Sequence, residues 1–236
     1  MSVKIASHGV FELKHTDKFT SDPHWGHNGV IKSCARPFCC KHSMNEKLID
    51  NWNRAVHPKQ RIFILGDMFY GGSPAFMRRT VARLNGYKVL VKGNHEPDPE
   101  VVASLGIDEV YLTVEATYRD WLGKELRILM RHIPDRVGAI SHDLHLCGHV
   151  HEKWALSGNI INVGVDIWDY EPKTLRFMVE HADKRQGALP EQLSVDDAWE
   201  ARSDQLVERM YSKKLRVPDS VLGDTAKKND PDETSS

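Results

Sequence analysis

The apolar pattern is strongest in residues 61–67, RIFILGD, where four consecutive apolar residues end in a glycine and a carboxylate. Such a run predicts a strand that is buried on both faces and delivers Asp67 at its carboxyl end. Residues 17–22 and 87–95 show the same pattern, and each also ends in polar side chains. Open α/β sheets bind ligands at the carboxyl ends of their strands, so we expect a site where these three segments end.

The spacing of apolar residues predicts the remaining elements. Asn28 is a suitable N-cap for a helix over 29–35, and Ser43 with Glu46 forms a capping-box pattern for a second helix. A loop rich in glycine precedes a helix over 74–84, and 97–106 predicts a short helix. The expected strands cover residues 3–14, 17–21, 61–67, 87–92, 109–118, 125–132, 144–147, 159–166 and 174–180.

The order of these elements predicts an α/β fold. Helices alternate with strands in the first half, whereas the second half reads as an antiparallel run. Two packed mixed sheets with helices outside, a four-layer αββα sandwich, would reconcile the halves and occupy residues 1–180. Residues 181–226 form an extension with one helix at about 194–214, and the polar residues 227–236 are expected to be disordered.

Composition removes several classes of protein. The chain of 236 residues has a formal charge of -1, so it has no bulk attraction to nucleic acid or to a lipid surface. Its apolar runs are too short to span a bilayer, and residues 1–14 lack the pattern of a signal peptide. We expect a soluble, cytoplasmic protein without a membrane partner, in which nucleic acid enters only as a substrate.

Several polar clusters consist of residues that bind metal ions. Asp22 and His24 lie two residues apart, and in an extended chain their side chains point the same way, toward one ion. His149 and His151 have the same spacing and can bind one ion or two neighbouring ions. Asp67 has two carboxylate oxygens, with which it can bridge two ions.

The order of these clusters resembles that of the calcineurin-like metallophosphoesterase superfamily. D-x-H, G-D, G-N-H, an isolated histidine and G-H-x-H follow one another between about residues 19 and 172. The small single-domain bacterial and phage branch has a similar R-P-F element, here 36–38, and a similar N-V-G-V-D element, here 162–166. The G-D-x-x-D-R-G element of the Ser/Thr protein phosphatases is incomplete in residues 66–72, which disfavours phosphoprotein phosphatase activity.

The resemblance implies a role for each matching residue. One metal ion would be held by Asp22, His24, Asp67 and His151, and the other by Asp67, Asn94, His132 and His149. His95 would lie beside the scissile phosphate as the general acid, or as a donor to the charge of the transition state.

The same resemblance implies the reaction. A water that bridges two divalent ions loses its proton and attacks phosphorus in line. We expect Mn²⁺, with Fe, Zn, Ni or Co as alternatives, and a small nucleotide-like or organic phosphodiester as substrate. A phosphomonoesterase and a nuclease acting on single-stranded nucleic acid remain alternatives. A non-catalytic scaffold is disfavoured because every ligand position has a suitable residue.

Four further interpretations stay open at this level. His142 competes with His132 for the isolated-histidine position, although His132 follows an apolar strand and precedes Ile-Pro. His27 contacts substrate phosphate or packs locally, and Arg36 binds phosphate or lies in a surface loop. Trp25 and Trp168 wall the site or belong to the core.

Overall fold

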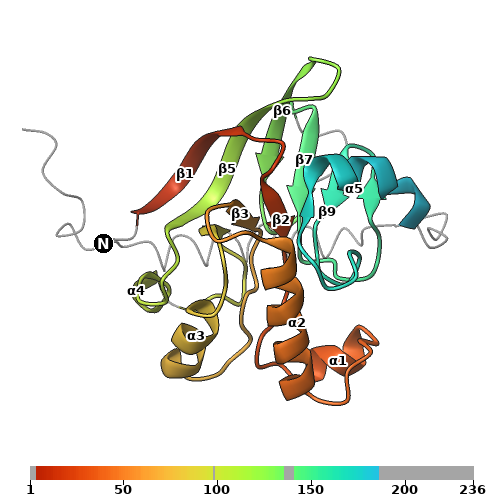
Figure 1. Cartoon of the computed structure of the whole chain (residues 1–236). Helices are drawn as coiled ribbons and strands as arrows, with labels where there is room; N and C mark the ends of the chain where they lie inside the picture. Colours follow the sequence, from red (N-terminus) through yellow and green to blue (C-terminus); the bar gives the residue numbers. More distant parts are fainter. Residues whose placement is uncertain (1–3, 98, 136–140, 186–236) are drawn as a thin grey trace, which may run out of the picture. The chain divides into compact units, whose positions relative to one another are not determined.

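The computed structural model describes residues 4–97, 99–135 and 141–185 (Figure 1). The predicted helix at 194–214 and the tail at 227–236 lie outside these residues. The strands are β1 (Lys4–Leu13), β2 (Lys18–Thr20), β3 (Arg61–Ile64), β4 (Tyr87–Val91), β5 (Glu109–Arg119), β6 (Glu125–Met130), β7 (Leu144–Cys147), β8 (Leu156–Ser157), β9 (Ile160–Asn162) and β10 (Lys173–Thr174). The helices are α1 (Gly29–Ser33), α2 (Lys41–Ala55), α3 (Pro74–Val81), α4 (Pro99–Ala103), α5 (Leu175–His181) and the 3-10 helix η1 (Asp183–Arg185).

Hydrogen bonds join the described strands into one mixed sheet with the order β10-β2-β3-β4-β5-β6-β7-β9-β8. Strand β5 pairs in parallel with β4 through residues 109–111 and antiparallel with β6 through residues 114–119. The strand direction in the sheet therefore reverses between β5 and β6. Strand β1 runs parallel to β5 along the opposite edge (Figure 1). The α/β class with a mixed sheet is confirmed, whereas the division into four layers stays a prediction.

Alternate residues of the central strands enter two different cores. Ile62 and Ile64 of β3 pack with α2, α3 and α4 on one face. Phe63 of β3 faces the other side, where it joins a cluster that includes Met130 of β6 and Leu146 of β7. Both faces of β3 are therefore buried, as the uninterrupted apolar run predicts. Among the described residues, no helix is long and apolar enough to cross a membrane.

Some predictions for individual segments were wrong. The second half is not an antiparallel run, since β6 pairs in parallel with β7 and β7 pairs in parallel with β9. Of residues 174–180, predicted as a strand, only Thr174 lies in a strand, β10, and residues 175–180 belong to helix α5. Thr174 is the N-cap of this helix, and its Oγ1 atom accepts a hydrogen bond from Phe177 N. Its buried residues Leu175 and Met178 have helical spacing, but a segment this short does not distinguish the two periods. Helix α2 begins at Lys41, and Ser43 Oγ donates to the Cys40 carbonyl, so Ser43 is not the N-cap.

Candidate metal centre

The predicted ligands follow the carboxyl ends of parallel strands. Strands β2, β3 and β4 run parallel, and Asp22, Asp67 and Asn94 come shortly after their respective ends. Strands β6 and β7 also run parallel to each other, and His132 and His149 follow them. Because β6 runs antiparallel to β5, this second group runs opposite to the first. The segments after both groups nevertheless meet, since His132 Nδ1 lies 2.7 Å from the Leu65 carbonyl.

Five of the predicted ligands have a left-handed backbone conformation, which residues other than glycine rarely adopt. These residues are Asp22, His24, Asp67, His149 and His151. The extended conformation assumed for the Asp22–His24 pair is therefore wrong. Hydrogen bonds from Asp22 N to the Gly66 carbonyl (3.1 Å) and from His24 N to the Asp67 carbonyl (3.2 Å) hold the chain instead. Strained backbone of this kind is concentrated at functional sites.

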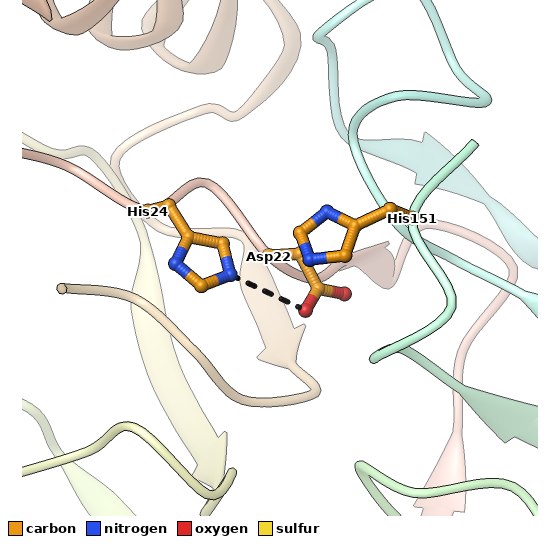
Figure 2. Close-up of side chains that lie close together, drawn as sticks. All are labelled: Asp22, His24 and His151. Atoms are coloured by element: carbon orange, nitrogen blue, oxygen red, sulfur yellow. Dashed lines mark ion pairs between the residues drawn. The ribbon is translucent and has the colours of Figure 1, made fainter. Parts of the chain in front are cut away.

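One group of potential ligands consists of Asp22, His24 and His151, whose ligand atoms all lie within 4.8 Å of one another. Figure 2 shows both imidazoles beside the Asp22 carboxylate, with His24 Nε2 3.9 Å from Asp22 Oδ1. Asp22 Oδ1 and both ring nitrogens of His24 are buried and have no hydrogen-bond partner among the described residues. Buried polar atoms normally have partners, so these atoms fit a site for a cation.

A second group consists of Asp67, His132 and His149. His132 Nε2 lies 3.4 Å from Asp67 Oδ2, and Asn94 Oδ1 lies 2.9 Å from His132 Nε2 and 3.0 Å from His149 Nδ1. His132 Nδ1 lies 2.7 Å from the Leu65 carbonyl, which can only accept. Nδ1 therefore carries the proton, and Nε2 is left to bind a metal ion.

Asp67 lies between the two groups. Its Oδ2 atom is 3.6 Å from His24 Nε2 and 3.4 Å from His132 Nε2, while its Oδ1 atom accepts a hydrogen bond from His95 N. A carboxylate in this position is placed to contact ions in both groups, as expected for the shared ligand of a two-metal site.

The surroundings shift the pKa values of the predicted ligands in different directions. Burial lowers the pKa of His24 and of His149 to about 3, so both imidazoles are neutral at pH 7. Burial opposes the ionisation of Asp67, but the neighbouring His132 outweighs it and lowers the pKa of this carboxyl. Burial lowers the pKa of His132, but the Asp67 carboxylate outweighs burial and raises it to about 9, so this imidazole is protonated at pH 7 and has to release a proton before its Nε2 atom can bind a metal ion. Neutral imidazole and ionised carboxylate are the forms that bind metals.

His95 lies at the open side of the centre. Its side chain is 40% exposed, and its Nε2 atom is 3.9 Å from Asp67 Oδ2. Tyr70, which sequence reasoning missed, presents its ring edge to His95 at 4.8 Å and stacks on His27 at 3.9 Å. The only signal in the sequence was an aromatic residue three positions after Asp67. His27 therefore lies beside the centre, in stacking contact with Tyr70.

The other predicted residues have different positions. Arg36 does not lie in a surface loop, because its side chain is fully buried and paired with Asp166. This burial does not support the predicted phosphate contact. His142 lies 3.8 Å from Glu115 and belongs to neither ligand group, which favours His132. Trp25 and Trp168 are core residues, with 0% and 1% exposure.

Comparisons with known proteins agree with this geometry. Residues 18–153 match the family model described as calcineurin-like phosphoesterase. The uncharacterized protein MJ1445 of Methanocaldococcus jannaschii is 30% identical over 173 residues, which cover 70% of this chain and 89% of that protein. The crystal structure of the protein of unknown function AQ665 from Aquifex aeolicus is similar, with a TM-score of 0.54, 25% identity and coverage of 70% of this chain and 97% of that one. The chain therefore belongs to the calcineurin-like phosphoesterases, which are metal-dependent phosphoester hydrolases.

Proposed function

We propose that this protein is a phosphodiesterase that hydrolyses small nucleotide-like or organic phosphodiesters with two divalent ions, Mn²⁺ in the first place. The observation that carries the proposal is the position of Asp67, whose Oδ2 atom lies within 3.6 Å of imidazole nitrogens from both ligand groups. One carboxylate between two sets of histidines supports a two-metal site, because it can contact both ions.

Each group would hold one ion in this proposal. Asp22, His24 and His151 bind the first, His132, His149 and Asn94 bind the second, and Asp67 contacts both. When bound, the two ions supply Lewis-acid stabilisation of the phosphate oxygens and lower the pKa of water. The two carboxylates neutralise half of the charge of two divalent cations, so the loaded site attracts an anionic phosphate ester.

His95 would donate a proton to the leaving oxygen. Its backbone N–H is fixed by Asp67 Oδ1, while its partly exposed imidazole remains accessible to a substrate. A positioned histidine of this kind suits proton transfer near neutral pH.

The test is hydrolysis of bis(p-nitrophenyl) phosphate by the purified protein with added Mn²⁺. We expect turnover that is abolished by EDTA and by Asp67→Asn, because this variant removes the shared charge. His142→Asn is the matched control and should keep wild-type turnover, since His142 lies outside both ligand groups. Absence of turnover with Mn²⁺, Fe²⁺, Zn²⁺, Ni²⁺ and Co²⁺ would overturn the proposal.

The same assay separates the finer alternatives. Faster hydrolysis of p-nitrophenyl phosphate than of the diester would make the protein a phosphomonoesterase. Cleavage of single-stranded DNA or RNA with a steep salt dependence would indicate a nuclease.

A further inference from the structure

Arg36 and Asp166 form a buried ion pair beside the metal centre. Arg36 Nε donates to Asp166 Oδ1 at 2.7 Å, and Arg36 Nη2 donates to Asp166 Oδ2 at 2.8 Å. The exposed fractions of the two side chains are 0% and 1%. A bidentate pair fixes both side chains in direction as well as distance. Because removal of water from two charges is costly, a pair buried this completely is weak evidence for stability and calls for another explanation.

The guanidinium of Arg36 also holds the segment that carries two metal ligands. Its Nη2 atom donates to the Asp22 carbonyl at 2.8 Å, and its Nη1 atom donates to the Pro23 carbonyl at 3.0 Å. This segment needs fixing because Asp22 and His24 both have left-handed backbone conformations. Both hydrogen bonds from Arg36 to this segment are therefore made to its main chain.

Asp166 holds the remaining ligand of the same group. Its Oδ2 atom lies 3.1 Å from His151 Nδ1, and an ionised carboxylate can only accept. Nδ1 therefore donates to Asp166, which leaves Nε2 of His151 to face a cation. A carboxylate behind a histidine ligand fixes both the tautomer and the direction of the ring.

We propose that Arg36 and Asp166 are positioning residues for one metal site, the group of Asp22, His24 and His151. The inference rests on the proposed two-metal function. In this proposal one ion pair connects two loops that are far apart in the chain, and it sets the geometry of one ligand group only. Within the described residues, neither member of the pair makes a hydrogen bond with Asp67, His132 or His149.

A third metal site at the same place is disfavoured. Cys34, His151 and Asp166 offer ligand atoms within 4.8 Å of one another. Both carboxylate oxygens of Asp166, however, already accept hydrogen bonds from the permanently charged guanidinium of Arg36. A second cation at Asp166 would face that charge at close range, so the pair supports a neighbouring site and does not replace one.

The experiment is calorimetric titration of metal-free protein with Mn²⁺. We expect two ions to bind to the wild type. Arg36→Lys keeps the positive charge but cannot donate the two parallel hydrogen bonds of the guanidinium to Asp166. Asp166→Asn keeps the shape of the side chain but loses its negative charge. Each should weaken one Mn²⁺ site by about 10- to 100-fold and leave the other unchanged. Asp17→Asn is the control. Asp17 is a buried residue just before β2 that pairs with the half-buried Arg61 of β3, away from the ligands. This variant should lower stability but bind both ions normally.

A double variant separates positioning from stability. Arg36→Met combined with Asp166→Leu leaves no unpaired buried charge, so its melting temperature should exceed those of the single variants. Its weakened Mn²⁺ site should not recover, because nothing holds His151 Nδ1. Recovery of that site in the double variant, or wild-type binding by both single variants, would overturn the inference alone. A wild type that binds none of Mn²⁺, Fe²⁺, Zn²⁺, Ni²⁺ and Co²⁺ would overturn the proposed function and this inference together.

Discussion

Glu96 Oε1 accepts a hydrogen bond of 2.7 Å from the backbone N–H of Met68. Its other oxygen, Oε2, accepts from Gly93 N at 2.5 Å. One buried carboxylate therefore ties the loop after β3 to the loop after β4, which carry Asp67 and His95. Burial raises the pKa of Glu96 to about 7, and the charge of Asp67 adds to this effect. The hydrogen bonds of Glu96 are to the main chain of these two loops and not to the imidazole of His95.

Replacement of Glu96 should therefore damage both stability and catalysis. Glu96→Ala leaves two buried N–H groups without an acceptor, at a cost of roughly 1–3 kcal/mol each. We expect a lower free energy of unfolding in urea. We also expect kcat to fall on the order of 10²-fold, because the two loops are no longer held in fixed positions relative to each other. Glu125→Ala, which changes an exposed carboxylate in β6, is the control. Wild-type kcat in Glu96→Ala would show that the tie has no part in catalysis.

His95 is expected to act in proton transfer and not in metal binding. His95→Ala leaves the backbone N–H that contacts Asp67 Oδ1, so Mn²⁺ binding should stay at the wild-type level. We expect kcat for a phosphodiester to fall by about 10²- to 10⁴-fold. If His95 is the general acid, the loss should be larger for an ester with a poor leaving group, such as a phenyl ester, than for a p-nitrophenyl ester. Equal losses for the two esters would instead indicate stabilisation of transition-state charge.

Tyr70 is expected to position the imidazoles of His27 and His95. Its ring stacks on His27 and meets the edge of the His95 ring. Aromatic pairs of this kind contribute about 0.5–1.5 kcal/mol, so Tyr70→Leu should lower kcat/KM by about three- to tenfold. Tyr70→Phe keeps the ring and should change little. Trp121→Leu, at a similarly exposed aromatic residue in the β5–β6 connection, is the control. An unchanged kcat/KM in Tyr70→Leu would contradict this role.

The sequence was sufficient to predict those parts of the centre that depend only on neighbouring residues in the chain. A buried strand that ends in a polar residue can be recognised within a few positions, and this placed Asp67 and His132 correctly at strand ends. The left-handed conformation of Asp22 could not be predicted, because it accompanies a hydrogen bond to Gly66, which is distant in the chain. The burial of Arg36 could not be predicted for the same reason, since its partner Asp166 is separated from it by 130 positions.

The prediction for helix α5 failed on a local ambiguity. The apolar side chains in residues 174–180 are compatible with a strand. The signal for a helix is a single hydroxyl group, that of Thr174, which forms the N-cap of α5. Over seven residues a strand and a helix bury similar numbers of apolar positions. Such a segment takes its structure from the surface against which it packs, here the cluster that also contains Phe63 and Leu146.

The stability of the fold should depend on pH through His145, a histidine that lies outside the metal centre. His145 of β7 is completely buried, and neither ring nitrogen has a hydrogen-bond partner among the described residues. Burial lowers the pKa of His145 to about 3, and the charges of Arg131 and His142 act in the same direction. In the unfolded chain the pKa is near 6.5, so the unfolded state binds a proton in a range where the folded state does not.

The sign of the effect follows from this difference. The contribution of His145 to stability is fully present above about pH 6.5 and is lost progressively as the pH falls toward 3. Between pH 7 and pH 5 the loss should be about 2 kcal/mol, at 1.36 kcal/mol per pKa unit. His145→Leu cannot titrate, so its advantage over the wild type in urea unfolding should grow by about that amount over the same interval. At pH 7 the variant should be at least as stable as the wild type, since it removes an unpartnered buried imidazole. If the difference between the two proteins is the same at pH 7 and pH 5, His145 accepts its proton without unfolding.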